Sequence, residues 1–135
     1  NTSSKSATAE EAGVAQVDAN VAIITKNGDV ITSCIIDAVQ SKAEFGTDGV
    51  VTTEAGNVAS KNQLGENYGM KGFSGIGKEW NEQAAAFAAY VTGKTAEEVA
   101  GTALTETTAP AEADLASSVT ISVGGFMALI EKIAK

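Results

Sequence analysis

Asp114-Leu-Ala-Ser-Ser-Val-Thr-Ile-Ser122, with the Val-Gly-Gly that follows it, leads into the last apolar segment of the chain. Beyond the glycines, apolar side chains recur at helical spacing at Phe126, Ile130 and Ile133. This spacing predicts an amphipathic helix that runs to the C-terminus.

The start of that helix has the features of an anion-binding site. Ser122 is expected to be the N-cap, because its hydroxyl can accept a hydrogen bond from an amide of the first turn. Gly124 and Gly125 add almost no bulk there, so a phosphate could approach the free amides at the positive end of the helix dipole. Hydroxyls at Ser117, Ser118 and Thr120 surround the same point. An ordinary self-capped helix start that binds nothing is the alternative interpretation.

Composition excludes several classes of function. The chain has 135 residues, a net charge of −8 and only nine basic residues, which argues against binding to nucleic acid. It contains no histidine, the usual general base and the commonest metal ligand. The one cysteine, Cys34, can form no internal disulfide and is expected to be a buried packing thiol. The absence of histidine argues against chemistry that depends on a histidine base or on histidine metal ligands.

The N-terminal half predicts hairpins after a polar start. Residues 1–14 lack apolar periodicity and are expected to form a disordered leader or tether, followed by one domain over residues 15–135. Asn27-Gly28 separates two β-branched runs and predicts a two-residue turn that would place Val21 opposite Cys34. A second, weaker hairpin is expected around Asp48-Gly49.

The middle of the chain predicts a long loop and two helices. Residues 54–77 are rich in glycine and asparagine and read as an irregular loop. Residues 78–92 predict a helix whose buried seam carries Trp80, Ala84, Phe87 and Val91. Thr95-Ala-Glu-Glu98 is a capping box that opens a short helix ending at Gly101. The expected fold class is α+β, a small antiparallel sheet of β-hairpins packed with two main helices and one short helix.

The order of residues from Asp114 to Ser122 resembles the Asp-x-x-Ser/Thr-Gly-Ala-Thr-x-Ser motif of FMN-binding domains. These domains occur in flavin-carrying subunits of sodium-pumping NADH:quinone oxidoreductase and the Rnf complex, and in related bacterial surface lipoproteins. The resemblance implies that Thr120 is the acceptor for a phosphoester-linked FMN, with Asp114 as the leading acid and Ser117 as the first hydroxyl. Ser118 and Val119 replace the Gly and Ala of the motif, which favours non-covalent FMN or none.

A second stretch, Glu66-Asn-Tyr-Gly-Met-Lys-Gly72, is similar to the Glu-Thr-Pro-Gly-Leu-Gly loop of the same family. In that family the loop lies against the isoalloxazine ring, so the resemblance adds four residues to the cofactor site: Glu66, Tyr68, Gly69 and Met70.

The function implied is a secreted or surface-anchored bacterial flavin carrier for electron transfer, held at a membrane only through a lipid anchor outside this chain. Its partner would be a redox protein or a quinone-linked membrane complex. The alternative is a flavin-free binding or structural module that has lost the cofactor.

Overall fold

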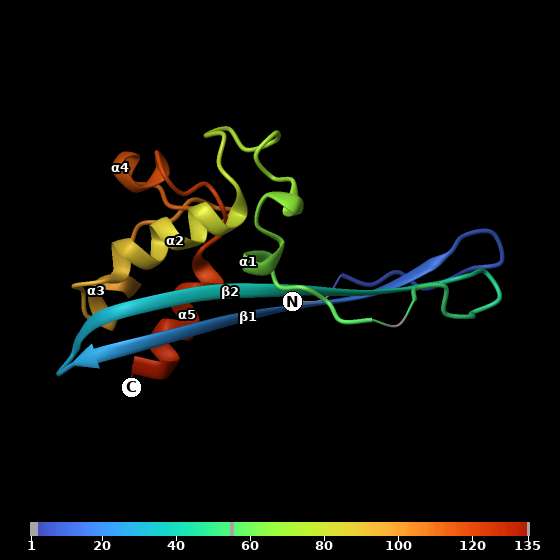
Figure 1. Ribbon diagram of the computed structural model, residues 1–135, viewed down its shortest axis with the longest axis horizontal. Coiled ribbons are helices and arrows are strands. Elements are labelled where there is room, and N and C mark those ends of the chain that lie inside the picture. Colours follow the sequence, from blue (N-terminus) through green and yellow to red (C-terminus); the bar gives the residue numbers. More distant parts are fainter. Residues whose placement is uncertain (1–2, 55, 135) are drawn as a thin grey trace. The chain divides into compact units, whose positions relative to one another are not determined.

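The structure, a computed structural model, describes residues 3–54 and 56–134 of the chain (Figure 1). Two strands form one antiparallel sheet, β1 (Gly13–Asn27) and β2 (Val30–Phe45). The helical elements are α1 (Lys61–Leu64), the 3-10 helix η1 (Gly65–Tyr68), α2 (Trp80–Val91), α3 (Ala96–Ala100), α4 (Ala113–Ala116) and α5 (Gly124–Ala134). The predicted α+β fold class is confirmed.

Contacts divide the chain into two compact units. One comprises Asn20–Asp37 and Lys61–Lys135, and the other comprises Asn1–Ala19 and Ala38–Ser60. Both strands contribute residues to both units. All the helices belong to the first, which we call the helical unit.

The core of the helical unit forms around α2 and α5. The predicted seam of α2 is confirmed, because Trp80, Ala84, Phe87 and Val91 are each at most 4% exposed. The ring of Phe126, on α5, meets Trp80 edge-on at 6.0 Å between centroids. Apolar side chains at this spacing fold into a helix because one face of it can then leave water. The seam therefore fixes α2 against α5.

The two predicted helix signals around Gly93 are also confirmed. Gly93 has a φ of 88°, the left-handed conformation that glycine adopts without a steric penalty. Thr95 then caps α3, since its hydroxyl accepts from the Glu98 amide at 3.2 Å and Glu98 accepts from the Thr95 amide at 2.7 Å. These backbone and side-chain hydrogen bonds of Thr95 lower the pKa of the exposed Glu98 carboxyl.

The predicted hairpin is present, but its predicted turn was wrong. β1 continues through Asn27 and β2 begins at Val30, so the two turn residues are Gly28 and Asp29. Gly28 has a φ of 59°, which suits a turn that needs glycine at its first central position. The hydroxyl of Thr25 therefore lies 2.7 Å from that of Thr32, and the predicted pairing of Val21 with Cys34 does not form.

A β-bulge interrupts β2 at Thr32 and Ser33. The Thr25 hydroxyl contacts both of theirs, at 2.7 and 2.8 Å, so two residues of β2 oppose one of β1. Burial changes phase at the same place: Ile31 is buried before the bulge and Ile36 after it. The strand lengths, 15 residues for β1 and 16 for β2, agree with one inserted residue.

The other unit contains the predicted leader and the second hairpin. Lys5 pairs with Val14 through two backbone hydrogen bonds of 2.7 and 2.8 Å, although a disordered leader was predicted over residues 1–14. Asn1 and Thr2 lie outside the described residues, and the leader and domain boundaries stay predictions. The second hairpin forms only as an isolated bridge between Phe45 and Val51, with the Gly46 amide donating to the Val50 carbonyl at 2.8 Å. Its turn comprises residues 47–49 and is one residue longer than the predicted Asp48-Gly49 turn.

Candidate functional site

Gln83 connects the two segments that the sequence assigned to a cofactor. Its side chain is fully buried in α2. Its Oε1 accepts from the Thr120 amide at 2.8 Å, from the Thr120 hydroxyl at 3.0 Å and from the Ile121 amide at 3.2 Å. One amide oxygen thereby fixes the backbone of the predicted flavin-acceptor segment.

The other end of Gln83 reaches the glycine-rich loop. Its Nε2 donates to the Ser74 hydroxyl and to the Lys78 carbonyl, both at 3.2 Å, and lies 4.0 Å from the Met70 sulfur. The structure thus brings Met70 and Thr120 to opposite ends of one buried side chain. Buried amides are costly unless hydrogen-bonded, and here both ends have partners.

Glu79 organises the same loop from the residue before α2. Its side chain is 3% exposed, and its two carboxylate oxygens accept from the amides of Met70 and Lys71 at 2.9 Å each. Its own amide donates to Glu82 at 2.8 Å, which completes a capping box. Neither Glu79 nor Gln83 was predicted from the sequence as a site residue. The available signal was Gln83 three residues after Trp80 and four before Phe87, a polar residue on the buried seam.

The predicted N-cap of the C-terminal helix was wrong. α5 begins at Gly124, and the carbonyl of Val123 accepts from the amides of Phe126 and Met127. The Ser122 hydroxyl instead hydrogen-bonds with that of Thr108, whose carbonyl accepts from the Val123 amide at 2.9 Å. Thr108, which has a φ of 60°, therefore takes the Ser122 hydroxyl that was predicted to cap the helix.

The two glycines at the start of α5 allow close approach of other side chains. A Cβ on Gly124 would lie 3.0 Å from the Cβ of Thr108, and one on Gly125 would lie 3.1 Å from Nδ2 of Asn20. Within residues 3–54 and 56–134, neither glycine amide donates to a backbone carbonyl. Asn20 is exposed and adds an amide donor beside Gly125. The surrounding groups are neutral donors and hydroxyls, which suit an oxyanion such as a phosphate.

The remaining predicted residues are held by local bonds. The Ser117 hydroxyl donates to the carbonyl of Asp114, and the Ser118 amide donates to that of Leu115. Asp114 is an exposed residue of α4. Val119 is fully buried, so its side chain is part of the core.

Several backbone amides and the Tyr68 ring of the predicted ring-binding loop already have partners within the chain. Gly69 ends η1 at a φ of 76°, and its amide donates to the carbonyl of the exposed Glu66. The half-buried Tyr68 ring is covered by the Lys61 ammonium at 4.7 Å from its centroid. Because Glu79 also takes the amides of Met70 and Lys71, a flavin ring would have to be held by side chains.

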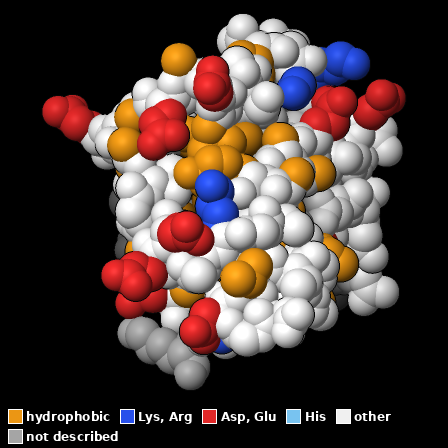
Figure 2. Space-filling model, turned by 90° about the vertical axis from the view of Figure 1, so that its left-hand side faces the viewer, with side chains coloured by type: hydrophobic (Ala, Val, Ile, Leu, Met, Phe, Trp, Pro, Cys, Tyr) orange, Lys and Arg blue, Asp and Glu red, His pale blue; other side chains and the backbone are white. Residues whose placement is uncertain are grey.

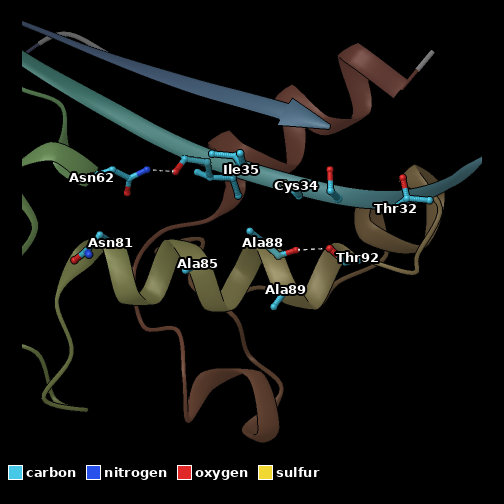
Figure 3. Close-up of a pocket in the computed structure, with 11 residues that line it drawn as sticks. Thr32, Cys34, Ile35, Asn62, Asn81, Ala85, Ala88, Ala89 and Thr92 are labelled. Carbon is cyan, nitrogen blue, oxygen red and sulfur yellow. Dashed lines mark hydrogen bonds between the residues drawn. The ribbon is translucent and has the colours of Figure 1, made fainter. Parts of the chain in front are cut away.

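A groove that the sequence did not predict lies between β2 and α2 (Figure 3). Its volume is about 380 Å³, and its walls contain polar residues and small apolar ones: Thr32, Ser33, Cys34, Ile35, Ile36, Asn62, Asn81, Ala85, Ala88, Ala89 and Thr92. Burial raises the pKa of the half-buried Cys34 thiol to about 11. The cysteine is therefore a protonated wall residue at neutral pH, not a nucleophile.

A smaller hollow, of about 300 Å³, is lined by residues of α3 and α5: Ala96, Glu97, Ala100, Glu131 and Ala134. Figure 2 shows this side of the molecule, where acidic side chains surround exposed hydrophobic atoms. The charge around the hollow opposes the binding of anions there.

The described residues contain neither a metal-binding cluster nor a helix suited to span a membrane. No three His, Cys, Asp or Glu side chains gather closely enough to hold a metal ion among them. None of the helices within residues 3–54 and 56–134 has the length and apolarity needed to cross a membrane.

Comparisons with known protein families, with curated proteins and with solved structures give no significant match to this chain.

Proposed function

We propose that this protein binds FMN reversibly and serves as a flavin carrier in electron transfer. The observation that carries the proposal is Gln83, which contacts Thr120 on one side and lies against Met70 on the other. The resemblance to FMN-binding domains had assigned those two residues to the acceptor segment and to the ring-facing loop. One buried side chain fixes both segments in the folded protein.

The phosphate would be held at the start of α5. Gly124 and Gly125 supply amides, and Ser122 and Asn20 supply a hydroxyl and a side-chain amide. Bound flavin would supply the one- or two-electron chemistry, while the chain binds and orients it. The secreted or lipid-anchored setting and the redox partner are part of this proposal.

Reversible binding is favoured over a covalent link. Thr120 is exposed, but its hydroxyl and its amide are both engaged by Gln83. Val119 is packed into the core where the attachment motif has alanine. A flavin transferase would have to close around a backbone that Gln83 already holds through hydrogen bonds to the Thr120 and Ile121 amides.

The test is a titration of the purified protein with FMN and, separately, with riboflavin, followed by flavin fluorescence and absorbance. FMN should bind at least tenfold more tightly than riboflavin, because only FMN carries the phosphate. Ser122→Ala should weaken FMN binding several-fold. Ser41→Ala is the matched control, since Ser41 is an exposed serine of β2 that belongs to neither predicted cofactor segment. Equal affinities for FMN and riboflavin, or no binding up to millimolar FMN, would refute the proposal.

A second candidate is a flavin-free binding module, favoured by one observation. Phe73 is 93% exposed on a loop that Glu79 and Gln83 hold in place. A large apolar side chain displayed on an ordered loop is typical of an interaction anchor. Colourless protein from its native host, without an FMN-sized increase in intact mass and without FMN binding, would favour this module.

A further inference from the structure

We propose that the groove between β2 and α2 binds a short, uncharged, extended peptide segment, which adds as a strand to the outer edge of β2. This inference does not depend on the flavin proposal. The segment would occupy the space between two points at which the same edge is already closed by the chain itself.

The edge of β2 is closed on both sides of Cys34. On one side, the Ile31 amide donates to the Lys94 carbonyl and the Gly93 amide donates to the Ile31 carbonyl, both at 2.8 Å. On the other side, Nδ2 of Asn62 donates to the carbonyl of Ile36 at 2.8 Å (Figure 3). Five residue steps separate the closed points, and each step of a strand advances about 3.3 Å. A segment of about three or four residues fits between them.

The bulge determines which backbone groups face that space. Ile31 points its backbone outward before the bulge, and the extra residue at Thr32 and Ser33 shifts the alternation by one. After the bulge, the backbone groups of Cys34 and Ile36 face away from β1. The hydrogen bond from Asn62 to the Ile36 carbonyl agrees with this direction. The amide and carbonyl of Cys34 are left facing the groove. Strand edges of this kind recognise extended peptides through backbone hydrogen bonds.

The opposite wall leaves room for a strand. It consists of Ala85, Ala88 and Ala89 of α2, whose short side chains keep the groove open at about 380 Å³. A ligand strand would direct its small apolar side chains toward this wall, and its backbone would remain at hydrogen-bonding distance from β2. Larger residues at the alanine positions would fill that space.

An unsatisfied buried atom marks the α1 end of the groove. Oδ1 of Asn81 is buried and has no hydrogen-bond partner among the described residues. It lies on the first turn of α2, in the wall that also contains Asn62 (Figure 3). A buried carbonyl oxygen without a donor costs about 1–3 kcal/mol. An N–H of a bound peptide would supply the missing donor.

The charge pattern restricts the ligand further. None of the eleven wall residues is ionisable at neutral pH, given that burial keeps the Cys34 thiol protonated. The chain as a whole carries −8, which disfavours acidic peptides. Neither a charged headgroup nor a phosphate would find a partner in the groove. An uncharged peptide rich in small apolar residues matches it.

The experiment is a selection from octapeptides of random sequence displayed on phage, followed by binding measurements with the synthetic peptides recovered. Ala89→Trp should fill the groove and weaken binding at least tenfold. Ala128→Trp is the matched control, because Ala128 is an exposed helical alanine that does not line the groove. Unfolding midpoints of both variants establish that each remains folded.

Two further measurements test the mode of binding. Peptide binding should slow hydrogen exchange of the Cys34 amide at least tenfold, as seen by NMR. Methylation of the single peptide nitrogen that pairs with β2 should abolish binding. Failure to enrich any peptide, equal binding to the Ala89→Trp variant or unchanged exchange at Cys34 would each overturn the proposal.

Discussion

The two sides of α2 differ in whether their buried polar atoms have hydrogen-bond partners. On one side, Gln83 hydrogen-bonds to the Thr120 segment and to the glycine-rich loop, and the preceding Glu79 hydrogen-bonds to the same loop, so their buried polar atoms all have partners. Toward β2, the helix places alanines and Asn81, whose buried carbonyl oxygen has no partner within residues 3–54 and 56–134. The lengths of the side chains explain the difference. Gln83 and Glu79 cross to the neighbouring loops, whereas alanine stops short of β2 and leaves a groove.

The comparison separates what this helix needs for stability from what it leaves available for binding. A fully satisfied buried polar network fixes one arrangement of the segments it joins. An open wall with an unpaired acceptor contributes little to folding. Mutations on the two sides should therefore have effects that differ in size even where the residue types are similar.

Gln83→Ala should have the largest effect. It removes the acceptor for two backbone amides and the Thr120 hydroxyl, and it also leaves a cavity. A loss of about 3 kcal/mol in the free energy of unfolding is expected, because each buried group left without a partner costs about 1–3 kcal/mol. Urea unfolding followed by circular dichroism measures it.

Glu97→Ala, at an exposed position of α3, is the control and should change stability by about 0.5 kcal/mol or less. If Gln83→Ala lowered the free energy of unfolding no more than this control, Gln83 would not stabilise the arrangement of the two predicted cofactor segments.

Glu79→Gln should have an intermediate effect. The substitution keeps the shape of the side chain but exchanges one acceptor oxygen for a donor, so one of the amides of Met70 and Lys71 loses its partner. Hydrogen bonds to charged groups contribute about 1.5–3 kcal/mol, so a loss of about 2 kcal/mol is expected. Faster hydrogen exchange at the Met70 and Lys71 amides should accompany it. An unchanged exchange rate would show that the carboxylate does not hold the loop.

The sequence predicted the parts of this arrangement that depend on local patterns. The seam of α2 and the capping box of α3 follow from residue spacing, and both are confirmed. The first hairpin is present, but its turn lies one residue later than predicted. The glycine-rich loop was expected to be irregular, yet α1 and η1 form within it. Both are only one turn long, too short for periodicity to reveal.

The failures have a common physical origin in contacts between distant segments. Ser122 was assigned as a cap because nothing in the sequence shows that Thr108 lies beside it. The turn of the hairpin moved by one residue, and the bulge at Ser33 then shifted the alternation of β2. The groove depends on that shift and on the placement of α2. No local pattern could therefore have predicted it.

Asn81→Ala should have the smallest effect and gives the sharpest test of the two-sided comparison. It removes an amide from the same helix as Gln83→Ala does, but the buried oxygen it removes has no partner to lose. Removing an unsatisfied buried acceptor relieves its desolvation cost, and alanine favours the helix by a few tenths of a kcal/mol. Stability should stay within about 0.5 kcal/mol of the parent protein or rise, while the affinity for groove-selected peptides falls. A loss of stability comparable to that of Gln83→Ala would show that Asn81 is a structural residue, and the two sides of α2 would then be alike.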